Sequence, residues 1–125
     1  MINKNYAKEL TQKLIQFNEQ ADVIYEEVRA AGKEKDFYSE VKPFADEVHT
    51  ACSEWKDNMK EWMGMESFTH LFPLQIEQTA NNLSDVAVQA FFPKTSYKRF
   101  KSHIQSVRYI LHNVRDEIDR KLTNV

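Results

Sequence analysis

The sequence predicts an all-α protein, an antiparallel up-and-down four-helix bundle. The 125 residues include only two Gly and three Pro, which leaves little material for the many turns of an all-β fold. Apolar residues recur at alternating steps of three and four along most of the chain, as in helices that bury one side. A chain of this length forms one domain by default, so we expect a single bundle over residues 1–125.

The first helix is expected over residues 5–31. Its apolar positions step by three and four without a break: Ala7, Leu10, Leu14, Phe17, Ala21, Ile24, Val28 and Ala31. Gly32 follows and is suited to the left-handed conformation that closes many helices. The charged residues 33–36 can then serve as a short connection.

The second helix is expected over residues 40–63, with Pro43 near its start. Its apolar positions are Phe37, Val41, Phe44, Val48, Ala51, Trp55, Met59 and Trp62. If Ser39 caps the helix, Pro43 falls in the first turn, where its missing N–H costs nothing. If the helix begins near Asp36, Pro43 should kink it. We favour a regular helix from about Pro43 to Met63, preceded by a turn that contains Phe37.

The third helix is expected over residues 73–92. Pro73 stands in the position favoured at a helix start, and the pair Phe92-Pro93 breaks the helix. Its apolar positions are Ile76, Ala80, Leu83, Val86, Ala87, Ala90 and Phe91. Several of these side chains are small, which allows a neighbouring helix to approach closely.

The last helix is expected over residues 96–122, with Thr95 or Ser96 as its cap. Its apolar positions are Phe100, Ile104, Val107, Leu111, Val114, Ile118 and Leu122. Four helices of similar length with mostly short connections favour antiparallel neighbours.

Two segments resemble a known family. They read DFYSEVKPFADEVHTACSEW at residues 36–55 and YKRFKSHIQSVRYILHNVRDEIDR at residues 97–120. Both are similar to the YppE-like family, small helical proteins of unknown function from low-GC Gram-positive bacteria. The resemblance covers most of the chain and implies a single four-helix bundle. It implies no activity, cofactor or catalytic residue.

The last helix carries an aligned row of basic residues, although the whole chain has a net charge of −2. Residues 1–92 hold nine Lys or Arg against sixteen Asp or Glu, and residues 93–125 hold eight against three. On a helical wheel the row is rotated by roughly 90° from the apolar side. We call this candidate interaction surface the basic stripe: Lys98, Lys101, Arg108, His112 and Arg115.

Three interpretations of the basic stripe remain open. Its residues can pair with acids of adjacent helices, such as Glu19, Asp22, Glu26, Asp46, Glu47, Glu54 and Asp57. If exposed, the stripe would span about 25 Å and could bind an acidic protein partner or the phosphates of a nucleic acid. We favour pairing within the bundle. Between the two external ligands we rank the protein partner above nucleic acid, because the rest of the chain is acidic and repels a polyanion.

Large apolar side chains gather around the end of the second helix. The candidate apolar patch consists of Trp55, Met59, Trp62, Met63, Met65 and Phe68. These side chains either seal the end of the bundle beneath the longest connection, or form a surface for a partner or a second copy of the chain.

No catalytic or cofactor motif is found in the sequence. Di-iron bundles repeat a Glu-x-x-His motif on two helices, and only Asp46-x-x-His49 approximates it, once. His49 and Cys52 have the spacing of two ligands on one helix, but zinc needs a third protein ligand. Two glycines leave no nucleophile elbow and no phosphate-binding loop. We therefore expect no enzyme, no metal site and no cofactor.

Cellular location and function are expected from what remains. Cys52 is alone, so no intrachain disulfide can form, and no apolar run approaches the roughly 18 residues that a membrane span requires. The N-terminal residues lack the apolar core of a signal peptide. We expect a cytoplasmic, non-enzymatic interaction or regulatory protein without membrane association. Its partner would be a protein or a second copy, and weak nucleic-acid binding is the alternative.

Overall fold

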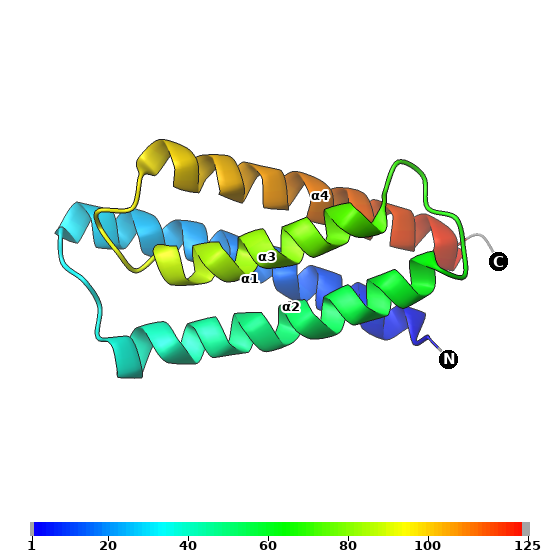
Figure 1. Ribbon diagram of the computed structural model, residues 1–125, viewed down its shortest axis with the longest axis horizontal. Helices are drawn as coiled ribbons and strands as arrows, with labels where there is room; N and C mark the ends of the chain where they lie inside the picture. Colours follow the sequence, from blue (N-terminus) through cyan, green and yellow to red (C-terminus); the bar gives the residue numbers. More distant parts are fainter. Residues whose placement is uncertain (1, 124–125) are drawn as a thin grey trace.

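The computed structural model describes residues 2–123, which form four helices in antiparallel order. They are α1 (Lys4–Ala31), α2 (Lys42–Met63), α3 (Pro73–Gln89) and α4 (Tyr97–Thr123), with a π-helical turn, η1 (Phe37–Val41), before α2. Successive helices alternate in direction, so that α1 begins and α4 ends at the same end of the molecule (Figure 1). The predicted all-α, up-and-down four-helix bundle is confirmed.

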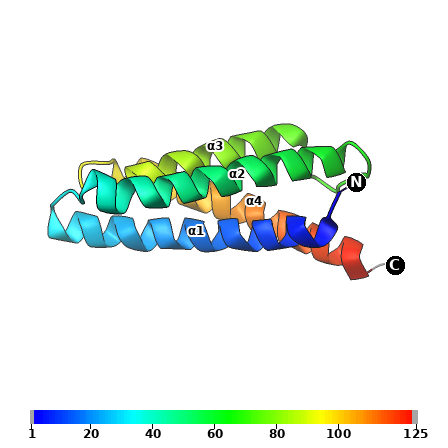
Figure 2. The ribbon, with the colours of Figure 1, turned by 90° about the horizontal axis from the view of Figure 1, so that it is seen from below.

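Each helix packs against two adjacent helices, and α1 also contacts α3 across the bundle. α1 lies between α2 and α4, and α3 contacts the same two helices from the opposite side. α1 and α2 run side by side along one side of the molecule (Figure 2). Within residues 2–123, no helix combines the length and the apolar content that crossing a bilayer requires.

Most positions of the predicted apolar stripes meet in one core, whereas Ala31 and Phe37, at the ends of their stripes, are exposed. Burying each large apolar side chain contributes about 1.5–3 kcal/mol. Position 24 differs from the expectation, because Ile24 is only half-buried whereas Tyr25 is fully buried. The Tyr25 ring lies 4.1 Å from the ring of Phe100, and its hydroxyl donates to the Thr95 carbonyl at 2.6 Å. A tyrosine near the bundle end thus buries its ring and still satisfies its hydroxyl.

The ends of α1 and α3 show how local hydrogen bonds stop a helix. Gly32 adopts the expected left-handed conformation, with φ at 67°, and its N–H donates to the Val28 carbonyl at 2.9 Å. α3 ends at Gln89, earlier than the predicted residue 92. The Thr95 hydroxyl donates to the Gln89 carbonyl at 2.9 Å, and the chain tightens into a turn at Phe91.

Pro43 lies in the first turn of α2, directly after η1. The cap of this segment is Asp36 rather than Ser39, because the Asp36 carboxylate accepts from both the N–H and the hydroxyl of Ser39, at 2.9 and 2.8 Å. The Val41 N–H donates five residues back, to the Asp36 carbonyl. The Lys42 N–H likewise donates five residues back, to the Phe37 carbonyl. The α-helical hydrogen-bond ladder therefore starts only at α2, with Pro43 in its first turn.

The long connection between α2 and α3 is fastened to α4 by a buried carboxylate. Glu117 accepts a hydrogen bond from the Thr69 N–H at 3.1 Å and another from Arg120. Burial alone raises the pKa of Glu117, but the hydrogen bonds from Arg120 and Thr69 outweigh it and lower the pKa overall. Glu117 is therefore ionised at neutral pH and ties the connection to the helix.

Candidate functional site

Two residues of the basic stripe are paired with carboxylates of α1. Lys101 Nζ lies 2.6 Å from Asp22 Oδ1 and 2.8 Å from Glu26 Oε1. Arg108 donates from Nε and Nη2 to the two oxygens of Glu19, at 2.7 and 2.9 Å. Bidentate pairs of this kind are the geometrically most specific ion pairs. They line the seam between α1 and α4, as the pairing interpretation predicts.

The pKa shifts of Glu19, Lys101 and Arg108 all favour the charged form of the side chain. The hydrogen bond from Arg108 lowers the pKa of Glu19, against an opposing effect of burial. The same bond raises the pKa of Arg108. Burial alone lowers the pKa of Lys101, but its bonds to Asp22 and Glu26 outweigh burial and raise it. Each shift favours the charged form, so the pairs persist at neutral pH.

The other residues of the basic stripe do not form one free surface. Lys98 is exposed and has no acid within 4.0 Å among residues 2–123. His112 is half-buried, and Arg115 contacts its chain neighbour Asp116 at 3.4 Å. The unbroken cationic row that could follow several phosphates is therefore not present, because its central members are neutralised by α1.

The candidate apolar patch is for the most part core. Trp55, Met59 and Trp62 are fully buried, whereas Met65 is 66% exposed. The remaining members, Met63 and Phe68, are half-buried and pack against the core. Of the two interpretations, the sealed bundle end describes these residues, since Met65 is the one member of the six that is mostly exposed. The connection after α2 packs over Trp62, whose ring lies 5.3 Å from the ring of Phe68 and whose indole donates to Glu66 at 2.6 Å.

Cys52 is buried on α2, whereas His49, one turn earlier, is exposed. Cys52 is 2% exposed, and burial raises the pKa of its thiol to about 11, although a hydrogen bond with Ser84 opposes the rise. Asp46, the other half of the Asp-x-x-His motif, pairs with Lys42 at 2.6 Å. Within residues 2–123, no three His, Cys, Asp or Glu side chains are close enough to hold a metal ion.

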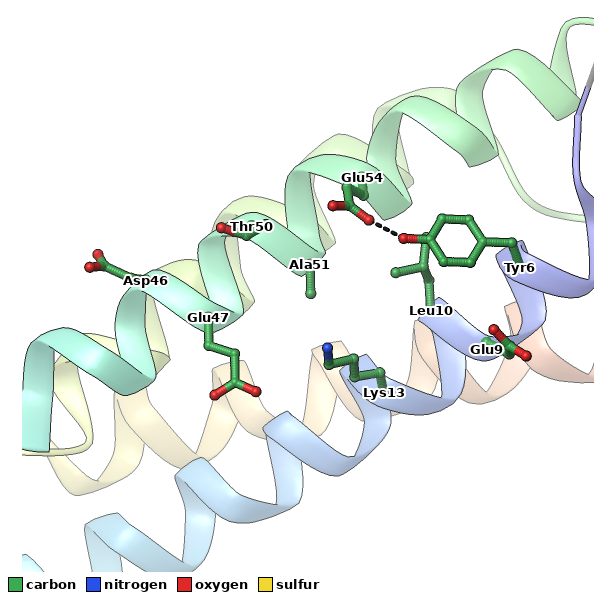
Figure 3. A pocket seen from close by; sticks show the side chains of 9 residues that line it. All are labelled: Tyr6, Glu9, Leu10, Lys13, Asp46, Glu47, Thr50, Ala51 and Glu54. Atoms are coloured by element: carbon green, nitrogen blue, oxygen red, sulfur yellow. Dashed lines mark hydrogen bonds between the residues drawn. The ribbon is translucent and has the colours of Figure 1, made fainter.

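A hollow of about 550 Å³ lies on the seam between α1 and α2 (Figure 3). The Tyr6 hydroxyl donates to Glu54 across the seam, which raises the pKa of Tyr6. Leu10 and Ala51 are buried beneath it, and Glu47 points from α2 toward α1. The hollow is lined by Tyr6, Glu9, Leu10 and Lys13 of α1 and by Asp46, Glu47, Thr50, Ala51 and Glu54 of α2.

A second hollow, of about 430 Å³, lies farther along the same seam. It is lined by Glu19, Gln20, Val23 and Ile24 of α1 and by Phe44 of α2. Val23 is 57% exposed, and the half-buried Phe44 packs edge-on against Phe17 with ring centres 5.9 Å apart. Because the helices are antiparallel, the later part of α1 faces the start of α2. We call the two hollows together the α1–α2 groove.

The α1–α2 seam differs from the α1–α4 seam in its polar contacts. Over residues 2–123, ion pairs of 4.0 Å or less join α1 to α4, whereas none joins α1 to α2. Sequence reasoning missed the groove, and treated Glu47 and Glu54 as partners for the basic stripe. Two signals were present: Tyr6 and Val23 are apolar or aromatic residues beside, and not on, the core stripe of α1.

The fold and these surfaces define the chain as a four-helix bundle with a continuous apolar core and a groove between α1 and α2. The chain belongs to a bacterial family known as the domain of unknown function DUF1798, whose model matches residues 11–118. This agrees with the resemblance to YppE-like proteins, which is confirmed.

Relatives of known sequence and structure support this membership. The uncharacterized protein YppE of Bacillus subtilis is 28% identical over 113 residues, which are 90% of this chain and 92% of YppE. The crystal structure of YppE matches with a TM-score of 0.92 at 26% identity, over 98% of this chain and 100% of that one. A Listeria innocua protein of unknown function matches with a TM-score of 0.90 at 33% identity, over 94% of each chain.

Proposed function

We propose that this protein is a non-enzymatic, cytoplasmic interaction module that binds a protein partner along the α1–α2 groove. The observation that carries this proposal is the exposed side chain of Val23 beside a hollow walled by Ile24 and Phe44. Apolar surface next to a concavity is what protein-binding sites offer. The single cysteine, Cys52, is a free thiol, as is common in proteins of a reducing compartment.

The chemistry of the groove favours binding over catalysis. Its lining contains neither Cys nor His, so it lacks the usual nucleophile and base of covalent catalysis. Cys52, the one thiol, is buried with a raised pKa and makes a poor nucleophile. Non-enzymatic binding therefore requires the fewest additional assumptions.

The alternative, weak nucleic-acid binding through the basic stripe, is less well supported. Lys101 and Arg108 are paired with Glu19, Asp22 and Glu26, which removes the charge that would attract phosphates. Lys98 and Arg99 are the exposed basic pair that remains at the start of α4. Reversing their charge is therefore the variant that isolates this alternative without breaking an ion pair.

Affinity capture from a Bacillus subtilis lysate, with and without nuclease, tests the proposal. The bait proteins are wild type, Glu9→Lys/Glu47→Lys in the groove, and Lys98→Glu/Arg99→Glu on the stripe. We expect a nuclease-resistant protein that is retained by wild type and by the stripe variant but lost with the groove variant. Recovery that depends on nucleic acid and on Lys98 would support the alternative. Equal recovery by all three baits would overturn the proposed function.

A further inference from the structure

We infer that the α1–α2 groove binds a basic amphipathic helical segment of its partner, an inference that rests on the proposed function. The groove combines an apolar hollow at one end with a mostly acidic hollow at the other. The length, the apolar wall and the charge of the groove each restrict which segment can bind.

The apolar hollow is suited to bind an aliphatic or aromatic side chain of the partner. Its wall is formed by Val23, Ile24 and Phe44 and by the stems of Glu19 and Gln20. Phe44 is held in place by edge-on contacts with Phe17 and with Phe91, so this wall is rigid. A rigid apolar pocket at an exposed seam is the setting in which one buried side chain contributes most of the binding energy.

The mostly acidic hollow is suited to bind Lys or Arg side chains of the partner. Its lining contains one basic residue, Lys13, and four acidic residues: Glu9, Asp46, Glu47 and Glu54. Within residues 2–123, neither Glu9 nor Glu47 has a cationic group within 4.0 Å. Carboxylates that are not neutralised internally attract Lys or Arg of a partner and speed its association.

The length of the groove matches a helix. From Tyr6 to Val23 α1 advances about 25 Å, at 1.5 Å per residue, which equals about 17 residues of a helical partner. A helix laid in a groove is recognised by apolar anchors on one side and by charges along its flanks. The partner segment should therefore place an apolar residue near Val23 and Lys or Arg near Glu47 and Glu9.

A second copy of the chain fits the groove less well. In such a copy, the basic residues Lys101 and Arg108 of α4 already form ion pairs with acids of its own α1. The exposed Lys98 and Arg99 lie at one end of α4 and cannot cover a groove of this length. We therefore assign the groove to a different protein.

Peptide titration tests the inference with the intact protein. The probe is a helical peptide of about 18 residues with a leucine face flanked by lysines, and the matched control peptide carries glutamate in place of every lysine. Isothermal calorimetry measures the dissociation constant for wild type, Glu9→Lys/Glu47→Lys and Val23→Ser. The matched control variant is Asp57→Lys/Glu61→Lys, which reverses two exposed charges of α2 outside the groove. Circular dichroism verifies that every variant keeps its helical content.

We expect wild type and the control variant to bind the lysine peptide equally, with no binding of the glutamate peptide. Glu9→Lys/Glu47→Lys should weaken binding by at least about tenfold, which corresponds to 1.4 kcal/mol. Val23→Ser should weaken it severalfold, because the apolar anchor loses its contact. Binding that falls equally in both charge-reversal variants would reduce the effect to net charge and overturn the inference.

Two further outcomes separate this inference from the proposed function. If the lysine peptide does not bind while lysate capture still depends on Glu9 and Glu47, the groove has a partner that is not a basic segment, and only the inference fails. If wild type sediments as a dimer that Glu47→Lys dissociates, the occupant is a second copy, which also overturns the inference. If neither peptide binding nor capture depends on the groove, both proposals fail.

Discussion

Arg108 of α4 donates hydrogen bonds to both carboxylate oxygens of Glu19 of α1, at 2.7 and 2.9 Å. This relationship explains the unequal distribution of charge along the chain, because the acids of α1 neutralise the basic residues of α4. Complementary charges on adjacent helices favour the observed pairing of α1 with α4 and disfavour shifted registers. Lys101 and Arg108 thus contribute to the packing of α4 against α1, and we propose that binding uses the α1–α2 groove instead.

The Arg108–Glu19 pair should show a small, salt-dependent coupling energy. Both side chains are more than a third exposed, so solvent screening limits the coupling to about 0.2–1 kcal/mol. Urea unfolding of Arg108→Ala, Glu19→Ala and the double variant measures it, first at low and then at high salt. Arg99→Ala with Glu19→Ala serves as an unpaired control. No coupling at low salt would show that the pair is only a geometric coincidence.

Replacing Glu117 by Gln should destabilise the protein and change its response to acid. The buried carboxylate accepts from Thr69 and Arg120, and weakening these bonds costs about 1–3 kcal/mol at neutral pH. The folded pKa of Glu117 lies below its ordinary value of 4.5, since the hydrogen bonds outweigh the raising effect of burial. Its stabilisation is therefore full above pH 4.5 and is lost as the pH falls through the folded pKa.

Thermal unfolding of wild type and Glu117→Gln as a function of pH measures this effect. We expect the difference in stability to be largest near neutral pH and to shrink below about pH 4.5. Glu61→Gln, at an exposed position of α2, should leave the pH curve unchanged. A difference that stays constant down to pH 3 would contradict the assigned role of Glu117.

Thr11→Val should cost more than its small change in shape suggests. The Trp55 indole donates to the Thr11 hydroxyl at 2.9 Å, and both residues are fully buried. Valine leaves the indole N–H without an acceptor, which costs about 1–3 kcal/mol. Urea unfolding followed by tryptophan fluorescence measures the loss, and Thr50→Val on the surface of α2 is the control. Equal stability of both variants would show that the buried bond contributes nothing.

The Cys52 thiol should react only when the protein unfolds. With burial raising its pKa to about 11, roughly one thiol in ten thousand is ionised at neutral pH. Alkylation by iodoacetamide should therefore be slow in buffer and should accelerate along the urea unfolding curve. The variant Cys52→Ala/Ser53→Cys moves the thiol to an exposed neighbour and should react at once. Fast alkylation of folded wild type would contradict the buried position.

Much of the fold can be predicted because the apolar residues of each helix repeat with the helical period. They therefore lie on one face of the helix, and that face must be buried. Ala7 through Val28 and Phe100 through Ile118 define their helices almost residue by residue. Details that depend on tertiary contacts do not follow in this way. Tyr25 enters the core because Phe100 and Thr95 lie opposite it. Pro93 has no N–H to continue α3, and which group then satisfies the Gln89 carbonyl, here the Thr95 hydroxyl, depends on the fold of the connection.

The surfaces were harder to predict than the core. A helical wheel shows on which face of its helix a side chain lies, but not which other helix packs against that face. The alignment of Lys101 and Arg108 could be read from their spacing, and their pairing with α1 was one of several open interpretations. Glu47 looked equally suited to pair with α4, although it faces α1. Trp55 and Trp62 were ambiguous for the same reason, since a bulky side chain suits both a core and a binding surface.

Site-specific photocrosslinking in living Bacillus subtilis cells tests most directly whether the α1–α2 groove is an interaction surface. A photoreactive phenylalanine derivative replaces Thr50, which lines the groove, or Ser106, which is exposed on α4. We predict a discrete crosslinked protein at position 50 that disappears when Glu9→Lys/Glu47→Lys is added, and no such product at position 106. A partner captured at position 106 and absent at position 50 would contradict the account.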